Sequence, residues 1–326
     1  MRTDSTVERA ESGTRLPVPT SGVVVAGATA VLSGISVFVN SSAVHAFHSS
    51  TVYTAAKNLV ATLVLAAVSA AAVAGRRWSR AAAHWTTRPA RPERPRSWPR
   101  RLGLAYVGVV GGGIAFVLFF QGLAQMQATP AAFLRDSLVL WVALAAWPLL
   151  GERLSGWNLV AIAGLVGGQV AVLGGPGHLA LGQGSLLVLS ATVLWAVEVV
   201  VARWLLPGTS PAGLALTRMG VGSLVLLGWL TGTGKLGALV SLRPSQLGWV
   251  ALTGILLAGY VATWFTALAR ARAVDVTSVL VASALVTAAL GASAGTVNLA
   301  SQGLGLALIA AGAAVVVWTW PRRQPA

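Results

Sequence analysis

Apolar residues fill most of this chain in long runs, and short polar stretches interrupt them. Each run is about twenty residues long, the length that a helix needs to cross roughly 30 Å of hydrocarbon. This pattern predicts an all-α integral membrane protein with ten transmembrane helices. The expected helices lie roughly at 22–43, 52–74, 102–123, 129–150, 155–174, 183–205, 213–231, 246–269, 273–294 and 300–320.

The composition agrees with this pattern and excludes several functions. Only 10% of the 326 residues are charged, whereas a soluble domain usually has about 25%. The chain has no cysteine, which excludes disulfides and thiol chemistry. No catalytic triad, metal-binding motif or nucleotide loop occurs, so we expect neither an enzyme, nor a cofactor, nor a metal site.

The positive charge is concentrated in one loop. Nine arginines lie between Arg76 and Arg101, and such a run beside membrane helices is typical of a cytoplasmic loop that contacts anionic lipid rather than nucleic acid. With the N-terminus inside, the predicted inner segments hold eighteen Lys and Arg residues and the outer segments hold two. We therefore expect both termini to be cytoplasmic, in an inner or plasma membrane, with residues 1–20 as a disordered tail.

The second half of the chain repeats the first in a weaker form. Gly151 and Gly295 each precede a helix with matching residues seven, ten, fourteen and seventeen positions later. These residues are Asn158, Ala161, Leu165 and Gly168 in the first half and Gln302, Gly305, Ile309 and Gly312 in the second. The two repeats are expected at 21–174, which includes a basic loop at 75–101, and at 183–320. Each repeat holds five helices, and because five is odd the repeats should be inverted, as in carriers that work by alternating access.

The ten-helix plan, the turn Gly151-Glu152-Arg153-Leu154-Ser155 and the helix rich in small residues after it resemble the EamA branch of the drug/metabolite transporter superfamily. The resemblance implies a secondary carrier, often an exporter of amino acids or related metabolites, with a central cavity lined by both halves. The second half departs from this pattern, because Thr296 occupies the position of Glu152 and Leu299 that of Ser155. If the charged turn supports a gate, only one side of that gate is intact here.

Five ionisable residues interrupt the apolar spans: Lys57, Arg135, Asp136, Glu198 and Arg218. Each costs about 2.5–3.5 kcal/mol at the centre of a membrane helix, so each is a candidate functional residue. Their formal charges leave one positive charge, which indicates that most of them pair with one another.

Arg135 and Asp136 are neighbours in the fourth predicted span. They point about 100° apart on a helix, so both can face the interior, but we expect no ideal bond between them. One interpretation is a substrate-binding pair, in which the guanidinium binds a carboxylate and the carboxylate binds an amine or a proton. The other is a structural ion pair between helices. Trp141 would add a flat wall to the same face.

Glu198 lies in the sixth predicted span, one turn after Trp195. It is a candidate proton carrier, which would make protons the coupling ion. The alternative is a salt bridge to Arg203 or to Arg218 on the next helix. Lys57 and Arg218 occupy equivalent positions in the repeats, where each could end a gate or extend to the lipid headgroups.

Further candidates to line the cavity are Gln121, Tyr260 and Trp264, although a membrane tryptophan often serves packing alone. The sequence thus predicts an exporter of a small metabolite such as an amino acid, with that substrate and the bilayer as partners and a monomeric or homodimeric state. The alternatives are a non-transporting sensor or assembly protein of the same fold, and a membrane-embedded lipid-modifying enzyme.

Overall fold

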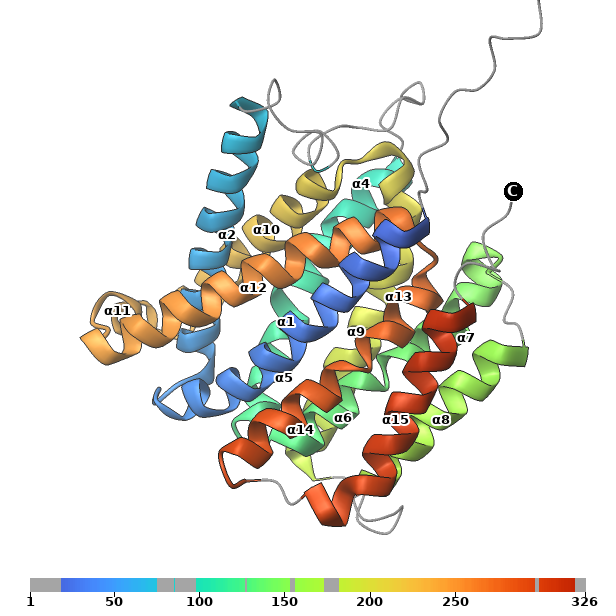
Figure 1. Cartoon of the computed structure of the whole chain (residues 1–326). Coiled ribbons are helices and arrows are strands. Elements are labelled where there is room, and N and C mark those ends of the chain that lie inside the picture. Colours follow the sequence, from blue (N-terminus) through green and yellow to red (C-terminus); the bar gives the residue numbers. More distant parts are fainter. Residues whose placement is uncertain are drawn as a thin grey trace, which may run out of the picture.

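The computed structural model describes residues 19–74, 85, 98–126, 128–152, 156–172, 182–296 and 299–319. These residues form a bundle of packed helices without a strand (Figure 1). The predicted disordered tail lies outside the described residues except for Pro19 and Thr20. Most of the predicted basic loop also lies outside them.

The first half contains the helices of the first five predicted spans. The third of these spans joins an α-helix, a nine-residue π-helix and a second α-helix, and the fourth is divided in two. The elements are α1 (Pro19–His45), α2 (Ser50–Ala74), α4 (Trp98–Ala105), η2 (Tyr106–Ile114), α5 (Ala115–Leu123), α6 (Ala128–Asp136), α7 (Leu138–Leu150) and α8 (Gly156–Val172).

The second half follows the same plan, with a divided helix again at its fourth span and a short extra helix, α11, before its third. Its elements are α9 (Gln183–Leu205), η4 (Leu206–Gly208), α10 (Pro211–Gly232), α11 (Leu236–Val240), α12 (Pro244–Arg270), α13 (Ala273–Leu280), α14 (Ser283–Ser293) and α15 (Leu299–Thr319).

Eight helical stretches among the described residues are long and apolar enough to cross a membrane. They correspond to all the predicted spans except the fifth and the tenth. At those two positions the structure has α8 and α15, whose apolar stretches Leu159–Gly168 and Gln302–Trp318 are shorter. These two helices pack along each other at the edge of the bundle (Figure 1).

The internal repeat extends to the conformation of the backbone. The fourth span breaks at Ser137, between α6 and α7, and the ninth breaks at 281–282, between α13 and α14. Each of these spans then ends at a glycine in the left-handed region, Gly151 with φ 67° and Gly295 with φ 70°. Glycine adopts this conformation without a steric penalty, which explains why both helices stop there.

Glycines also bring η2 and α10 into backbone contact. A Cβ added at Gly112 would overlap the carbonyl group of Arg218, and one added at Gly222 would overlap the backbone of Gly112. Small residues of this kind let membrane helices approach closely. The close approach holds Arg218, the charged residue of α10, against the first half of the chain.

Candidate functional site

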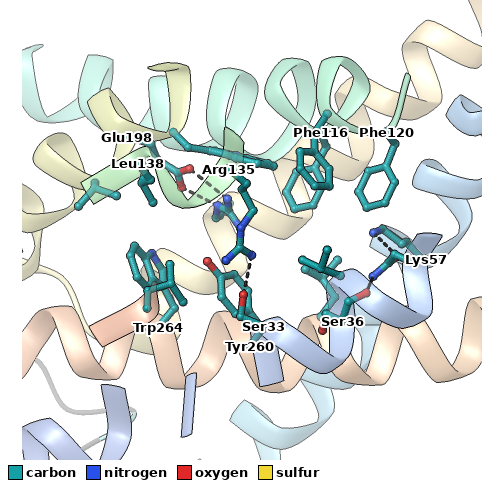
Figure 2. Close-up of a pocket in the computed structure, with 18 residues that line it drawn as sticks. Ser33, Ser36, Lys57, Phe116, Phe120, Arg135, Leu138, Glu198, Tyr260 and Trp264 are labelled. Atoms are coloured by element: carbon teal, nitrogen blue, oxygen red, sulfur yellow. Dashed lines mark hydrogen bonds and ion pairs between the residues drawn. The ribbon is translucent and has the colours of Figure 1, made fainter. Parts of the chain in front are cut away.

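A pocket of about 740 Å³ of empty space, part of it open to the surroundings, lies between the two halves of the chain (Figure 2). Its walls come from α1, α2, α5, α6 and α7 of the first half and from α9, α10, α12 and α13 of the second. The lining residues are Ser33, Ser36, Val37, Asn40, Lys57, Phe116, Phe119, Phe120, Arg135, Leu138, Trp195, Glu198, Val199, Arg218, Leu257, Tyr260, Trp264 and Leu280.

Glu198 of α9 and Arg218 of α10 form a buried ion pair in the wall of this pocket. Arg218 Nε donates to Glu198 Oε1 at 2.6 Å, and Arg218 Nη2 donates to Oε2 at 3.1 Å. Both carboxylate oxygens are therefore occupied by one guanidinium, in the two-pronged geometry that favours arginine over lysine. Of the two salt bridges considered from the sequence, the structure forms the one to Arg218.

Arg135 and Asp136 form a second ion pair, at the end of α6. Arg135 donates to Asp136 Oδ1 from Nη2 at 2.8 Å and from Nε at 3.3 Å. Our expectation that these neighbours would bond poorly was wrong, because α6 ends at Asp136 and the long arginine side chain bends back to it. Ser33 of α1 and Ser283 of α14 accept from the same guanidinium at 2.5 and 3.2 Å. The pair thus joins both halves.

Lys57 of α2 has only neutral partners among the described residues. Its Nζ donates to Asn40 Oδ1 at 3.0 Å and lies 3.3 Å from the centre of the Phe120 ring. Tyr53 also donates to Asn40 Oδ1. Lys57 is 1% exposed and Arg218 is 4% exposed, so the interpretation that they extend to the headgroups is wrong for both. They point into the pocket instead.

Aromatic rings make up much of the remaining pocket wall. Trp195 contacts Phe116 and Phe119, with ring centroids 5.4 and 5.2 Å apart. Tyr260 and Trp264 stack on each other, with centroids 6.0 Å apart and planes 15° apart. The wall is therefore a set of flat apolar faces interrupted by a few charged groups, which is typical of small-molecule sites.

Seven of the residues selected from the sequence line this pocket: Lys57, Arg135, Trp195, Glu198, Arg218, Tyr260 and Trp264. Three others do not. Asp136 lies behind Arg135 and bonds to Ser283, and Trp141 keeps a buried ring nitrogen without a partner. Gln121 lies near the end of α5, where its backbone carbonyl accepts from Gln125.

The sequence analysis missed the contribution of α1. Ser33, Ser36 and Asn40 line the pocket, and their spacing of three and four residues places them on one helix face. That spacing was the available signal. The analysis also missed the π-helix η2, whose Gly111 carbonyl accepts from Trp195 Nε1 at 3.0 Å. π-Helical turns often occur at functional sites.

A second link between the halves lies at Glu152. Its carboxylate accepts from the backbone N–H groups of Ala273 and Val274 at 3.0 and 3.2 Å, and so caps the N-terminus of α13. Arg203 of α9 lies 4.0 Å away. Asp275, in the first turn of α13, pairs with Arg272 at 2.8 Å. The charged turn therefore contacts the other repeat.

The fold and the site together define a helical membrane protein of two related halves that enclose a largely apolar pocket with a few buried charges. The sequence matches the EamA-like transporter family at residues 20–174 and 182–318. The chain belongs to that family, which is part of the drug/metabolite transporter superfamily.

A search of the solved structures finds a similar fold, and a search of the curated proteins finds no match. One crystal structure is 20% identical in sequence, has a TM-score of 0.66, and covers 94% of this chain and 99% of its own. At this identity the likeness supports the fold alone.

Proposed function

We propose that this protein is a secondary active transporter that exports a small metabolite, such as an amino acid, across the inner or plasma membrane. The proposal rests on the family and above all on one observation. Two buried ion pairs, Arg135 with Asp136 and Arg218 with Glu198, meet at a pocket lined by both repeats. Buried charge inside a membrane protein is costly and marks substrate and ion pathways.

The divided helices support a transport mechanism. Arg135 lies in the last turn of α6, Leu138 begins α7 and Leu280 ends α13, and all three line the pocket. Substrate sites in carriers are commonly built where membrane helices are interrupted. In the proposed mechanism, the ten helices form two inverted halves, with α8 and α15 as the fifth span of each. The halves rock about the pocket and open it to one side at a time.

The proposed orientation places both termini in the cytoplasm, because this places most Lys and Arg residues inside. Protons are the proposed coupling ion, and Glu198 is their proposed carrier. Protonation of this carboxylate would release Arg218, which would then be free to bind an anionic group of the substrate. The substrate anion and the Glu198 carboxylate would in this way compete for Arg218.

Flux through reconstituted protein tests the proposal. Liposomes that contain the purified protein should move labelled amino acids or related metabolites, and Asp136→Asn and Glu198→Gln should abolish this movement. Lys235→Ala, at an exposed position before α11, is the matched control and should leave it unchanged. Equal rates in all three variants would contradict the proposed site.

A non-transporting sensor of the same fold is the second candidate. It is favoured by Thr296, which replaces the charged residue of the turn in the second half and bonds within its own turn, to the Gly291 carbonyl. The two functions differ in one measurement. A sensor should show a ligand-dependent rise in melting temperature without flux. A transporter should show the same rise together with flux of the ligand.

A further inference from the structure

The cationic side chains around the pocket outnumber the carboxylates that neutralise them by one. Among the residues that the structure describes, Lys57, Arg135 and Arg218 face two carboxylates, Asp136 and Glu198, and each carboxylate is already bonded to an arginine. The excess charge belongs to Lys57, whose partners are the Asn40 carbonyl and aromatic rings. Ring faces and one carbonyl offset the cost of a buried ammonium only in part.

The polar groups that lack a partner in this pocket are suited to an anion. Within the described part of the chain, Arg218 Nη1 and Ser36 Oγ are buried without a hydrogen-bond partner, and Lys57 uses one of its three N–H donors on a hydrogen bond. Lys57 and Ser36 lie on the same side of the pocket in Figure 2. A carboxylate placed between Lys57 and Ser36 would supply both the missing counter-charge and an acceptor for the Ser36 hydroxyl.

The same pocket offers no comparable place for an ammonium group. Both oxygens of Glu198 accept from Arg218. The oxygens of Asp136 accept from Arg135 and Ser283, and Asp136 does not line the pocket. An amine would therefore have to share a carboxylate that already neutralises an arginine, and it would add positive charge to a pocket that already has an excess of it.

The body of the ligand would contact flat apolar faces. Phe116 and Phe120 lie beside Lys57 in Figure 2, and Tyr260 and Trp264 lie at the other end, with Arg135 between them. Aromatic ligands gain additional stabilisation from such faces through edge and offset contacts. The pocket thus combines one anion site with a space between aromatic side chains that suits the ring of a ligand.

We propose that the substrate is an aromatic or otherwise apolar monocarboxylate without an amine, held by its carboxylate at Lys57. This inference rests on the proposed transport function and narrows its substrate class. The proposed substrate has a single negative charge, whereas a free amino acid has one negative and one positive charge.

Three compounds that share one skeleton test the inference on the purified full-length protein. They are 3-phenylpropanoate, which has only the carboxylate, phenylalanine, which adds an amine, and 2-phenylethylamine, which has only the amine. Binding is measured by the quenching of tryptophan fluorescence and by isothermal calorimetry. The anion should bind at least about tenfold more tightly than the other two, as expected for a charged hydrogen bond that the others lack or offset.

Variants of Lys57 identify the group responsible. Lys57→Met keeps the length of the side chain and should weaken binding of 3-phenylpropanoate by about tenfold or more. Lys57→Arg should retain most of the binding, and Lys235→Ala should retain all of it. Ser36→Ala preserves the charge and should weaken binding several-fold. Circular dichroism and gel filtration establish that each variant is folded.

The outcomes separate this inference from the proposed function. Binding of 3-phenylpropanoate that depends on Lys57 but gives no flux in liposomes would support the anion site and contradict transport. Flux of phenylalanine or 2-phenylethylamine in preference to the anion would support transport and overturn the inference. Absence of binding by all three compounds, or equal binding in Lys57→Met, would also overturn it.

Discussion

Arg218 holds Glu198 against the opposite repeat. The two residues lie on α10 and α9 of the second half, with Nε and Oε1 2.6 Å apart. A Cβ at Gly111, in η2 of the first half, would overlap the Glu198 carboxylate. The ion pair is therefore enclosed between the halves, and any motion of one half against the other must change its surroundings.

Replacing one partner of this ion pair should destabilise the protein more than replacing both partners. Glu198→Gln leaves the Arg218 guanidinium buried without a counter-charge, so we expect a loss of about 3–5 kcal/mol in the free energy of unfolding. The double variant Glu198→Leu with Arg218→Met should recover most of that loss, because it buries no charge. Denaturant unfolding of both variants in detergent is the measurement. A double variant as unstable as the single one would contradict this account.

Two glycines of α10 provide a second, internally controlled prediction. Gly222 touches the backbone of Gly112, whereas a Cβ at Gly228, six residues later on the same helix, would meet nothing within 4 Å. Gly222→Ala should lower the free energy of unfolding by about 1–3 kcal/mol through overpacking. Gly228→Ala should be neutral or stabilising by up to about 1 kcal/mol, because alanine favours helix. Equal effects would mean that backbone contact is unimportant here.

The fold was largely predictable because each span is a long apolar run whose ends carry polar residues or glycine. Gly151 and Gly295 marked both the repeat and the helix ends, and the structure gives them the same left-handed φ. The partner of Glu198 was not predictable. Arg203 and Arg218 both lay within reach along the chain, and only the tertiary packing, in which η2 contacts both α9 and α10, decides between them. Arg203 instead donates to the Leu268 carbonyl at 3.1 Å.

The environment of Lys57 was also beyond prediction from one sequence. Asn40 lies on another helix, and although its spacing from Ser33 and Ser36 marks a polar face of that helix, nothing in the local pattern relates this face to Lys57. The π-helix η2 was hidden for a related reason. Three consecutive glycines in an apolar run are compatible with either helical form, and the choice depends on contacts with α10 and with Glu198.

Replacement of Gly151 or Gly295 should be harmful even though each has open space around it. Both have a positive φ, where a Cβ costs about 1–2 kcal/mol. We expect Gly151→Ala and Gly295→Ala each to lower the free energy of unfolding by about 1 kcal/mol. Gly156→Ala is the control, because that glycine also has open space but no positive φ. A neutral effect at Gly151 would show that the turn adjusts without strain.

In the proposed orientation, the contact of Glu152 with α13 should help to keep the pocket closed at its cytoplasmic end. Its carboxylate joins the first repeat to the N-terminus of α13 in the second. Capping interactions of this type contribute about 0.5–2 kcal/mol. The equivalent Thr296 bonds instead within its own turn, to the Gly291 carbonyl at 2.9 Å. The equivalent turns of the two repeats therefore make different contacts.

Because the chain has no cysteine, one introduced thiol can report this difference. In a Ser36→Cys background, we expect Glu152→Ala to speed labelling of the pocket by a membrane-impermeant maleimide added from the cytoplasmic side. Loss of about 1 kcal/mol from the closed state corresponds to roughly a fivefold change in population. Thr296→Ala is the matched control and should leave cytoplasmic labelling unchanged, because the Thr296 hydroxyl bonds to the Gly291 carbonyl of its own repeat. If both substitutions speed labelling equally, or neither does, Glu152 does not hold that end closed.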